Sequence, residues 1–75
     1  MKWNYRVLRH TDGGVDSNEE YFMVHEVYYE DDGKPSICTS NECKPFGNTL
    51  EELKSDMEMM VDAFEKPVLD YSDFP

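Results

Sequence analysis

The 75-residue chain has few basic residues, only two cysteines and no long hydrophobic run. Seven Lys and Arg residues stand against 17 Asp and Glu residues, which gives a formal net charge of −10 at pH 7. No apolar run approaches the roughly 20 residues of a membrane helix, and the first residues lead into no signal-peptide core. We therefore expect one small cytoplasmic domain over residues 1–75, with no membrane partner.

The shortage of basic residues argues against direct nucleic-acid binding, because such binding requires Lys and Arg side chains that displace counterions from phosphates. The nearest candidates are Lys2, Arg6 and Arg9, but strand alternation sends Arg6 and Arg9 to opposite faces. We expect these residues to pair with nearby carboxylates instead. Hydrophobic residues make up 39% of the chain and aromatic residues 13%, which excludes an acidic disordered tail.

The scarcity of cysteine and histidine argues against a metal site. Cys38 and Cys43 are spaced C-x4-C and lack the second pair of a four-ligand zinc site. His10 and His25 are the only histidines, and they stand at no recognisable ligand spacing. We expect two reduced thiols, no metal and no cofactor.

His25 is the one candidate for acid–base catalysis, since a carboxylate on another strand would complete a pair for proton transfer. The sequence places no Ser, Cys or Lys to complete a nucleophile–base arrangement, and it has no glycine-rich phosphate loop. A structural histidine is the preferred interpretation, so no catalytic residue is assigned and a non-enzyme is expected. The first alternative to a binding role is a small structural or self-associating protein, and the second is a hydrolase that uses His25.

Three segments have the periodicity of strands. Residues 3–9 alternate, with Trp3, Tyr5 and Val7 on one face. Residues 20–30 are largely apolar on both faces, which favours a central strand. A tight turn around Gly33 leads to residues 36–40, which are shorter and more polar and suit an edge strand. Residues 11–18 have the composition of a loop.

Thr49 begins the clearest helix signal, because Thr49 and Glu52 form a capping box and Pro67 ends the pattern after Lys66. We expect the apolar stripe of this helix to pack across one face of the sheet. The stripe consists of Leu50, Leu53, Met57, Met60, Val61 and Phe64.

These elements predict the α+β class: a three- or four-stranded antiparallel sheet with one helix packed across it, in the order β-β-β-α. Residues 68–75 are either a short final strand or a docking arm. One helix cannot cover both faces of the central strand, so Phe22, Val24 and Tyr28 need a second cover. The tail or a partner supplies that cover, and a homodimer is expected.

The acidic excess is concentrated on the predicted helix, with six acidic and two basic residues from Thr49 to Lys66. We expect such a face to dock a basic protein, such as a toxin, a nuclease or another nucleic-acid enzyme whose substrate the helix imitates. The alternative is a solvated face that serves solubility. Met59 lies off the apolar stripe and is expected to be exposed. The candidate partner-binding residues are Glu51, Glu58, Met59, Asp62 and Glu65.

Two sets of residues carry a resemblance to known families. The first set consists of Tyr5-Arg6-Val7, Tyr21 with His25 to Tyr29, Asp32 to Pro35, Pro45 to Leu53 and Lys66 to Leu69. These segments resemble a family of small uncharacterised bacterial proteins. The second set, at the start of the helix, consists of Gly47, Thr49, Leu50, Glu51 and Glu52. It is similar, more distantly, to the HicB-like antitoxin domain, which is a partial ribonuclease-H-like fold without its catalytic centre. This resemblance implies three strands followed by a helix and a non-catalytic, antitoxin-like role.

Overall fold

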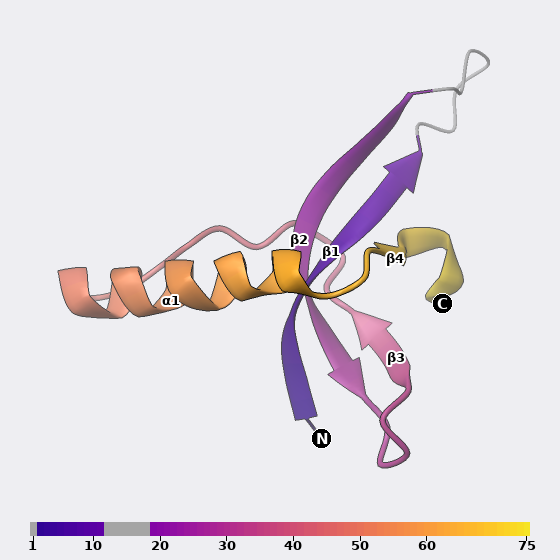
Figure 1. The fold of residues 1–75 in the computed structure, drawn as a ribbon, viewed down its shortest axis with the longest axis horizontal. Coiled ribbons are helices and arrows are strands. Elements are labelled where there is room, and N and C mark those ends of the chain that lie inside the picture. The colour runs from indigo at the N-terminus through magenta and orange to yellow at the C-terminus, as the bar shows by residue number, and fades with distance from the viewer. Residues whose placement is uncertain (1, 12–18) are drawn as a thin grey trace.

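Four strands and one α-helix form the part of the chain that the computed structural model describes, residues 2–11 and 19–75. The strands are β1 (Lys2–Thr11), β2 (Glu20–Tyr29), β3 (Pro35–Cys38) and β4 (Leu69–Asp70). The helix α1 (Leu50–Asp62) continues into the 3-10 turn η1 (Ala63–Glu65), and a second 3-10 turn, η2 (Tyr71–Asp73), follows β4. The α+β class and the predicted element order are confirmed (Figure 1). Most of the predicted loop at 11–18 lies outside the described residues.

The four strands form a mixed sheet in the order β3-β2-β1-β4. The β1–β2 and β2–β3 pairs are antiparallel, and β3 is an edge strand as predicted. The prediction of a wholly antiparallel sheet is wrong for β4, which pairs parallel to β1 with Leu8 opposite Leu69. The reason is the connection: α1 carries the chain back across the sheet, and such a crossover returns the chain in the same direction.

The register of β1 and β2 decides which residues lie under α1. Val7 lies opposite Val24 and Tyr5 opposite Glu26, so the odd positions of β1 and the even positions of β2 share one face. On this face Tyr5 and Val7 form a buried cluster with Met60 and Ala63 of the helical segment. The core under α1 is therefore small.

The opposite face of the sheet is covered by the C-terminal tail. The wholly buried side chains of this sheet face are Leu8 on β1 and His25 and Val27 on β2. Tyr71 of η2 stacks on His10 with ring centroids 4.3 Å apart, and Leu69 lies beside Leu8. The tail supplies a second cover, as one of the two predicted alternatives, but the prediction assigned it to the wrong face. Phe22, Val24 and Tyr28 lie on the face of α1, where Phe22 remains 55% exposed.

The ends of α1 follow from local chemistry. The Thr49 hydroxyl accepts a hydrogen bond from Glu52 N at 3.1 Å, and the Glu52 carboxylate accepts one from Asn48 N at 2.9 Å. The predicted cap is confirmed, with the return bond one residue earlier than in a capping box. Lys66 is extended, at φ −108° and ψ 156°, because Pro67 excludes the helical conformation from the residue before it.

Much of the predicted apolar stripe faces solvent. Met60 is 7% exposed and Leu53 is half-buried, whereas Leu50, Met57, Val61 and Phe64 are 81%, 45%, 57% and 70% exposed. The prediction that the whole stripe packs on the sheet is wrong. The C-terminal end of α1 meets the middle of the sheet, and its first turns project beyond the strands (Figure 1).

Candidate functional site

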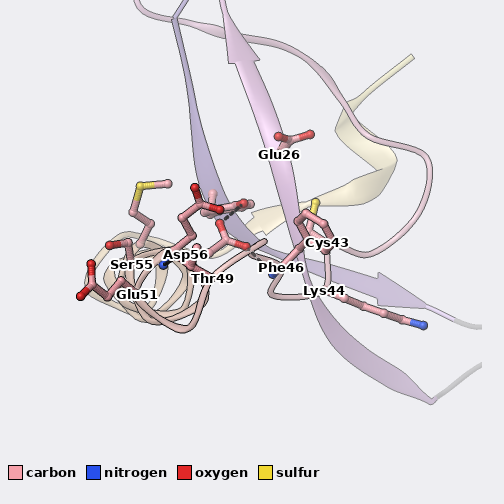
Figure 2. A pocket seen from close by; sticks show the side chains of 11 residues that line it. Glu26, Cys43, Lys44, Phe46, Thr49, Glu51, Ser55 and Asp56 are labelled. Atoms are coloured by element: carbon pink, nitrogen blue, oxygen red, sulfur yellow. Dashed lines mark hydrogen bonds between the residues drawn. The ribbon is translucent and has the colours of Figure 1, made fainter.

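A groove of about 810 Å³ lies between the first turns of α1, the loop that precedes α1 and the middle of β1 and β2 (Figure 2). Eleven residues line it, of which four are acidic and one, Lys44, is basic. The four carboxylate residues are Glu26, Glu51, Glu52 and Asp56. Tyr5, Phe46 and Met59 add aromatic and apolar surface. The groove can therefore hold a positively charged group beside an apolar wall.

Asp56 holds the walls of the groove together. One carboxylate oxygen accepts a hydrogen bond from the Tyr5 hydroxyl at 2.6 Å, and the other accepts one from Phe46 N at 2.8 Å. Burial of the phenol, followed by its bond to Asp56, raises the pKa of Tyr5 well above its ordinary value of 10. The phenol therefore stays neutral and keeps donating. In this way one side chain of α1 joins the helix to β1 and to the preceding loop.

Gly47 allows the loop to approach the first turn of α1. A Cβ atom at this position would lie 2.7 Å from Glu52 C and 2.8 Å from Leu53 Cα, which are backbone atoms that cannot rotate away. Only glycine fits there, because every other residue carries a Cβ atom. The close approach also brings Phe46 N to the Asp56 carboxylate.

The structure divides the five predicted partner-binding residues between two hollows and the open surface. All five are exposed. Glu51 and Met59 line the acidic groove, and Met59 and Asp62 line a second hollow of about 330 Å³. Glu58 and Glu65 line neither of these hollows. Met59 is 47% exposed and Met60 7%, so the prediction that Met59 is exposed is confirmed.

The sequence-based prediction missed the part of the groove that comes from outside the helix. Glu26 lies on β2 and Tyr5 on β1, and only the strand register places them together beneath α1. Phe46, which is 70% exposed, comes from the loop. A large aromatic residue between Pro45 and Gly47 was the one available signal, because a loop with such turn residues seldom buries its side chains.

Both ring nitrogens of the buried His25 form hydrogen bonds within the protein. Its Nδ1 lies 2.9 Å from the Thr39 carbonyl oxygen, and its Nε2 lies 2.9 Å from Nε2 of His10. Since a carbonyl oxygen only accepts, Nδ1 carries the proton and donates, and Nε2 accepts from His10. Burial lowers the pKa of His25, so the ring is neutral. Both nitrogens have partners within the protein, which agrees with a structural histidine.

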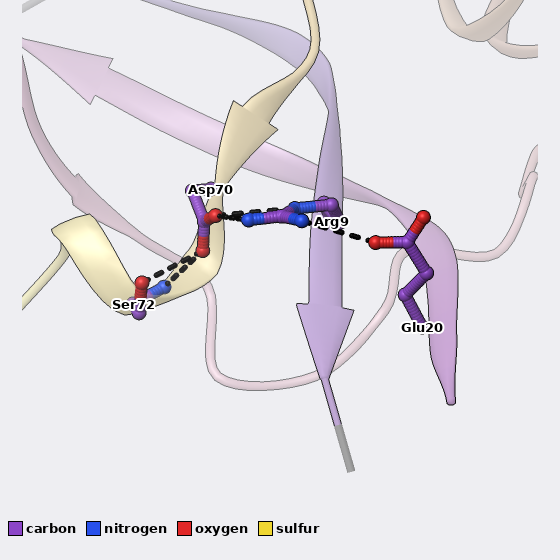
Figure 3. A network of polar contacts seen from close by, with 4 residues as sticks. All are labelled: Arg9, Glu20, Asp70 and Ser72. Carbon is purple, nitrogen blue, oxygen red and sulfur yellow. Dashed lines mark hydrogen bonds and ion pairs between the residues drawn. The ribbon is translucent and has the colours of Figure 1, made fainter. Parts of the chain in front are cut away.

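Arg9 fastens the tail to β1, as Figure 3 shows. Its guanidinium forms an ion pair with Asp70, in which Nε donates to the carboxylate at 3.2 Å, and it donates to Glu20 at 3.0 Å. Asp70 also accepts from the amide and hydroxyl groups of Ser72, at 3.1 and 2.7 Å. The bond from Arg9 and the bonds from Ser72 lower the pKa of Asp70 to about 2. The predicted pairing of Arg9 with carboxylates is confirmed.

Arg6 does not pair with a carboxylate, so that part of the prediction is wrong. Its side chain is 9% exposed and donates to the Tyr29 hydroxyl at 2.8 Å and to the Pro67 carbonyl at 2.7 Å. The strand register points Arg6 to the face that the tail covers, where a tyrosine and a backbone carbonyl are the available acceptors. Arg6 therefore links the sheet to the tail.

The cysteines are free thiols, and both are half-buried. Burial raises the pKa of Cys38 above its ordinary value.

Across residues 2–11 and 19–75, no group of three or more His, Cys, Asp and Glu side chains is arranged to hold a metal ion. Within the same described ranges, no helix has the length and apolar character needed to cross a membrane.

The chain was compared with protein-family models, with curated proteins and with solved structures, and none of the three comparisons gave a match. The fold and the groove define the chain as a small, acidic α+β domain whose single described α-helix is anchored at one end. Its function has to be inferred from this geometry.

Proposed function

We propose that the chain is a non-catalytic protein-binding module whose acidic groove takes up a basic segment of another protein. The observation that carries this proposal is the lining of the groove, with four carboxylate residues against one lysine beside exposed apolar surface. A net charge of −10 attracts a basic partner over a long range and speeds its approach. The contacts inside the groove then select the segment that binds.

The side chains of the groove suit arginine and lysine. Glu52 and Asp56 already accept hydrogen bonds from backbone N–H groups, so they shape the walls and contribute negative potential. Glu51 is exposed at the rim, on the side of α1 that also carries Glu58 and Asp62. The exposed ring of Phe46 offers a face for a guanidinium group, and Met59 offers apolar contact for its aliphatic stem.

The class of partner that we favour is a protein whose basic surface otherwise binds nucleic acid. A toxin or a nuclease of this kind meets a row of carboxylates on α1 in place of phosphates. The resemblance of the helix start to the HicB-like antitoxin domain supports an antitoxin-like role of this type. The two free thiols fit the reducing cytoplasm, which is the location that we propose.

The test uses an octa-arginine peptide as a probe and two matched triple variants. Glu51→Lys reverses a charge that lines the groove, and Glu58→Lys and Asp62→Lys extend the reversal along the adjoining helix face. Glu30→Lys, Asp31→Lys and Asp32→Lys make the same change in charge at the β2–β3 turn. In titration calorimetry the helix variant should bind the peptide about tenfold more weakly, or weaker still, and the turn variant should keep most of the affinity of the unmodified chain. Binding of the unmodified chain should also weaken as salt is raised from about 50 mM to about 300 mM.

Amide chemical shifts identify the surface that the peptide occupies. The largest changes should fall on residues that line the groove, such as Lys44, Phe46 and Ser55. An equal loss of affinity in both triple variants, or shift changes spread evenly over the acidic residues, would contradict the proposal. The acidic excess would then serve solubility alone.

A second candidate role is self-association, and a specific observation favours it. Among the described residues, twelve large hydrophobic side chains are exposed by 36% or more. The buried hydrophobic set has half that number, and a domain of this size seldom reaches high stability from one small core. We propose that the chain forms a homodimer that covers part of this exposed surface.

A further inference from the structure

The exposed half of the apolar stripe on α1 and η1 lacks a cover within the described part of this chain. We propose that it is the interface of a symmetric homodimer in which the α1 helices of two copies pack antiparallel. This inference rests on the self-association proposed above and assigns its surface. We call this surface the exposed stripe, and its members are Leu50, Met57, Val61 and Phe64, with Leu53 at its edge.

The spacing of the exposed stripe is symmetric about Met57. Leu53 and Val61 stand four residues before and after Met57, and Leu50 and Phe64 stand seven residues before and after it. A two-fold axis at Met57 therefore places Leu50 of one copy opposite Phe64 of the other, and Leu53 opposite Val61. Met57 meets its own counterpart. A surface that is complementary to itself in this way is what a two-fold interface requires.

The charges at the border of the exposed stripe support the same arrangement. Lys54 is the one basic residue of α1, and it is exposed beside the stripe, as is Glu58. In an antiparallel pair centred on Met57, Lys54 of one copy comes next to Glu58 of the other. The symmetry makes this contact twice. Charged residues that flank an apolar seam commonly set the orientation of paired helices in this manner.

The molecule exposes more surface than a compact chain of its mass. The chain exposes 5768 Å² of surface, whereas a compact monomer of its mass, 8.8 kDa, exposes about 4,800 Å². The excess of roughly 1,000 Å² belongs to an elongated molecule, with extents of 43 × 30 × 21 Å, and the exposed stripe contributes to it. The radius of gyration is 13.6 Å, against about 11 Å for a compact 75-residue domain.

The shape of the molecule leaves room for a second helix. The first turns of α1 project beyond the strands, so a second α1 can lie along them with its own sheet at the far end of the pair (Figure 1). Met59 follows Met57 by two residues and therefore points about 200° away around the helix. The acidic groove, which Met59 lines, stays open in this dimer.

The oligomeric state of two matched variants tests the interface. Met57→Glu places two like charges on the two-fold axis, and Ile37→Glu makes the same type of change on β3, where the side chain is 46% exposed against 45% for Met57. Sedimentation equilibrium should give twice the 8.8 kDa chain mass for the unmodified protein and for Ile37→Glu. Met57→Glu should sediment as a monomer, with the circular dichroism of a folded chain.

Charge exchange tests the antiparallel register. Lys54→Glu and Glu58→Lys should each raise the dimer dissociation constant about fivefold, because each creates two like-charge contacts. The double variant should restore the dissociation constant to within about twofold of the unmodified value. In a Cys38→Ser, Cys43→Ser background, Met57→Cys should form an intermolecular disulfide on oxidation, whereas Ser55→Cys, away from the axis face, should not.

Three results would overturn the inference. They contradict, in turn, self-association, the surface used for it and the antiparallel register. A chain that is still monomeric at about 100 μM, well above the dissociation constant of a stable dimer, would contradict self-association itself. The exposed stripe would then be left to bind a different protein. A dimer that survives Met57→Glu would show that copies associate through another surface. The antiparallel register would be excluded if Lys54→Glu left the dimer dissociation constant unchanged and the double variant did not lower it.

Discussion

The hydroxyl of Tyr5 donates a 2.6 Å hydrogen bond to the carboxylate of Asp56, across 51 residues of sequence. This bond turns the side of α1 that carries Asp56 toward the sheet. Met60 and Ala63 follow Asp56 by four and seven residues, so they share that side and are buried. Met57 and Val61 are turned to the surface in consequence. The bond and the packing of Met60 and Ala63 thus fix the same rotation of α1, which buries part of the apolar stripe and exposes the rest.

Removal of the Tyr5–Asp56 bond should destabilise the fold. Tyr5→Phe should lower the free energy of unfolding by about 1 kcal/mol, the usual net value of one hydrogen bond. Asp56→Ala should cost more, about 2–3 kcal/mol, because it also leaves the N–H of Phe46 without its acceptor. Urea unfolding at constant protein concentration measures both, since dimerisation makes stability depend on concentration.

Tyr28→Phe is the control for this pair. The hydroxyl of Tyr28 donates to Glu26 at 3.3 Å, a longer contact two residues away in sequence. Its loss should change stability by less than about 0.5 kcal/mol. If Tyr5→Phe proved no more costly than Tyr28→Phe, the bond to Asp56 would not contribute to the stability of the α1–β1 contact.

Alanine at Gly47 should be more disruptive than alanine at Gly33, for two different reasons. At Gly47 the added Cβ meets the backbone of Glu52 and Leu53, so the loop has to move away from α1. At Gly33 the Cβ has open space, but a φ of +85° strains any residue with a side chain. We expect a loss of about 1 kcal/mol for Gly33→Ala and more than about 2 kcal/mol for Gly47→Ala. Thermal unfolding of the two variants at equal concentration makes the comparison, and equal losses would contradict it.

The Asp70 carboxylate should titrate far below the ordinary range for aspartate. Its pKa in the fold is about 2, against an ordinary value of 3.8, so it stabilises the docked tail above pH 4 and loses that effect as the pH falls toward 2. The carboxyl carbon shift of Asp70 reports the midpoint directly. Arg9→Gln should move the midpoint up toward 3.8, because the bond from Arg9 is the largest cause of the shift. Lys44→Gln removes the same charge at the groove and should leave the midpoint near 2.

The buried His25 should make the protein less stable in acid. Burial lowers the pKa of His25 in the fold, while an unfolded histidine titrates near 6.5. Below pH 6.5 the unfolded state therefore binds the additional proton, and the free energy of unfolding falls by at most about 1.4 kcal/mol per pH unit until the folded pKa is reached. The groups around the ring are His10, Tyr71 and Thr39, and Glu42 opposes the shift by its charge.

Urea unfolding at pH 7.5 and pH 5.5 checks the contribution of His25. His25→Gln should flatten the pH dependence, although it also lowers stability at both pH values. His10→Gln should keep most of the dependence, because burial, the largest cause of the lowered pKa, remains. A pH dependence that is the same in His25→Gln as in the unmodified protein would contradict a neutral, buried His25.

Features that depend on neighbouring residues were predictable from the sequence. The cap at Thr49 uses a backbone N–H three residues away, and the turn at Gly33 needs only a residue that tolerates positive φ. Strand alternation in β1 and the end of the helix before Pro67 are local in the same sense. For these elements the chemistry that decides the conformation lies within a few residues, so the order of strands and helix could be predicted.

The tertiary structure decided the features that join distant segments. The rotation of α1 depends on a bond to Tyr5, the parallel pairing of β4 on the crossover through α1, and the burial of His25 on the tail that Arg9 and Arg6 hold in place. The acidic groove also forms only when β1, β2 and the loop meet α1. Periodicity in the sequence shows that a helix has an apolar side, but long-range hydrogen bonds and strand register determine which part of that side meets the sheet and which part is left for another chain.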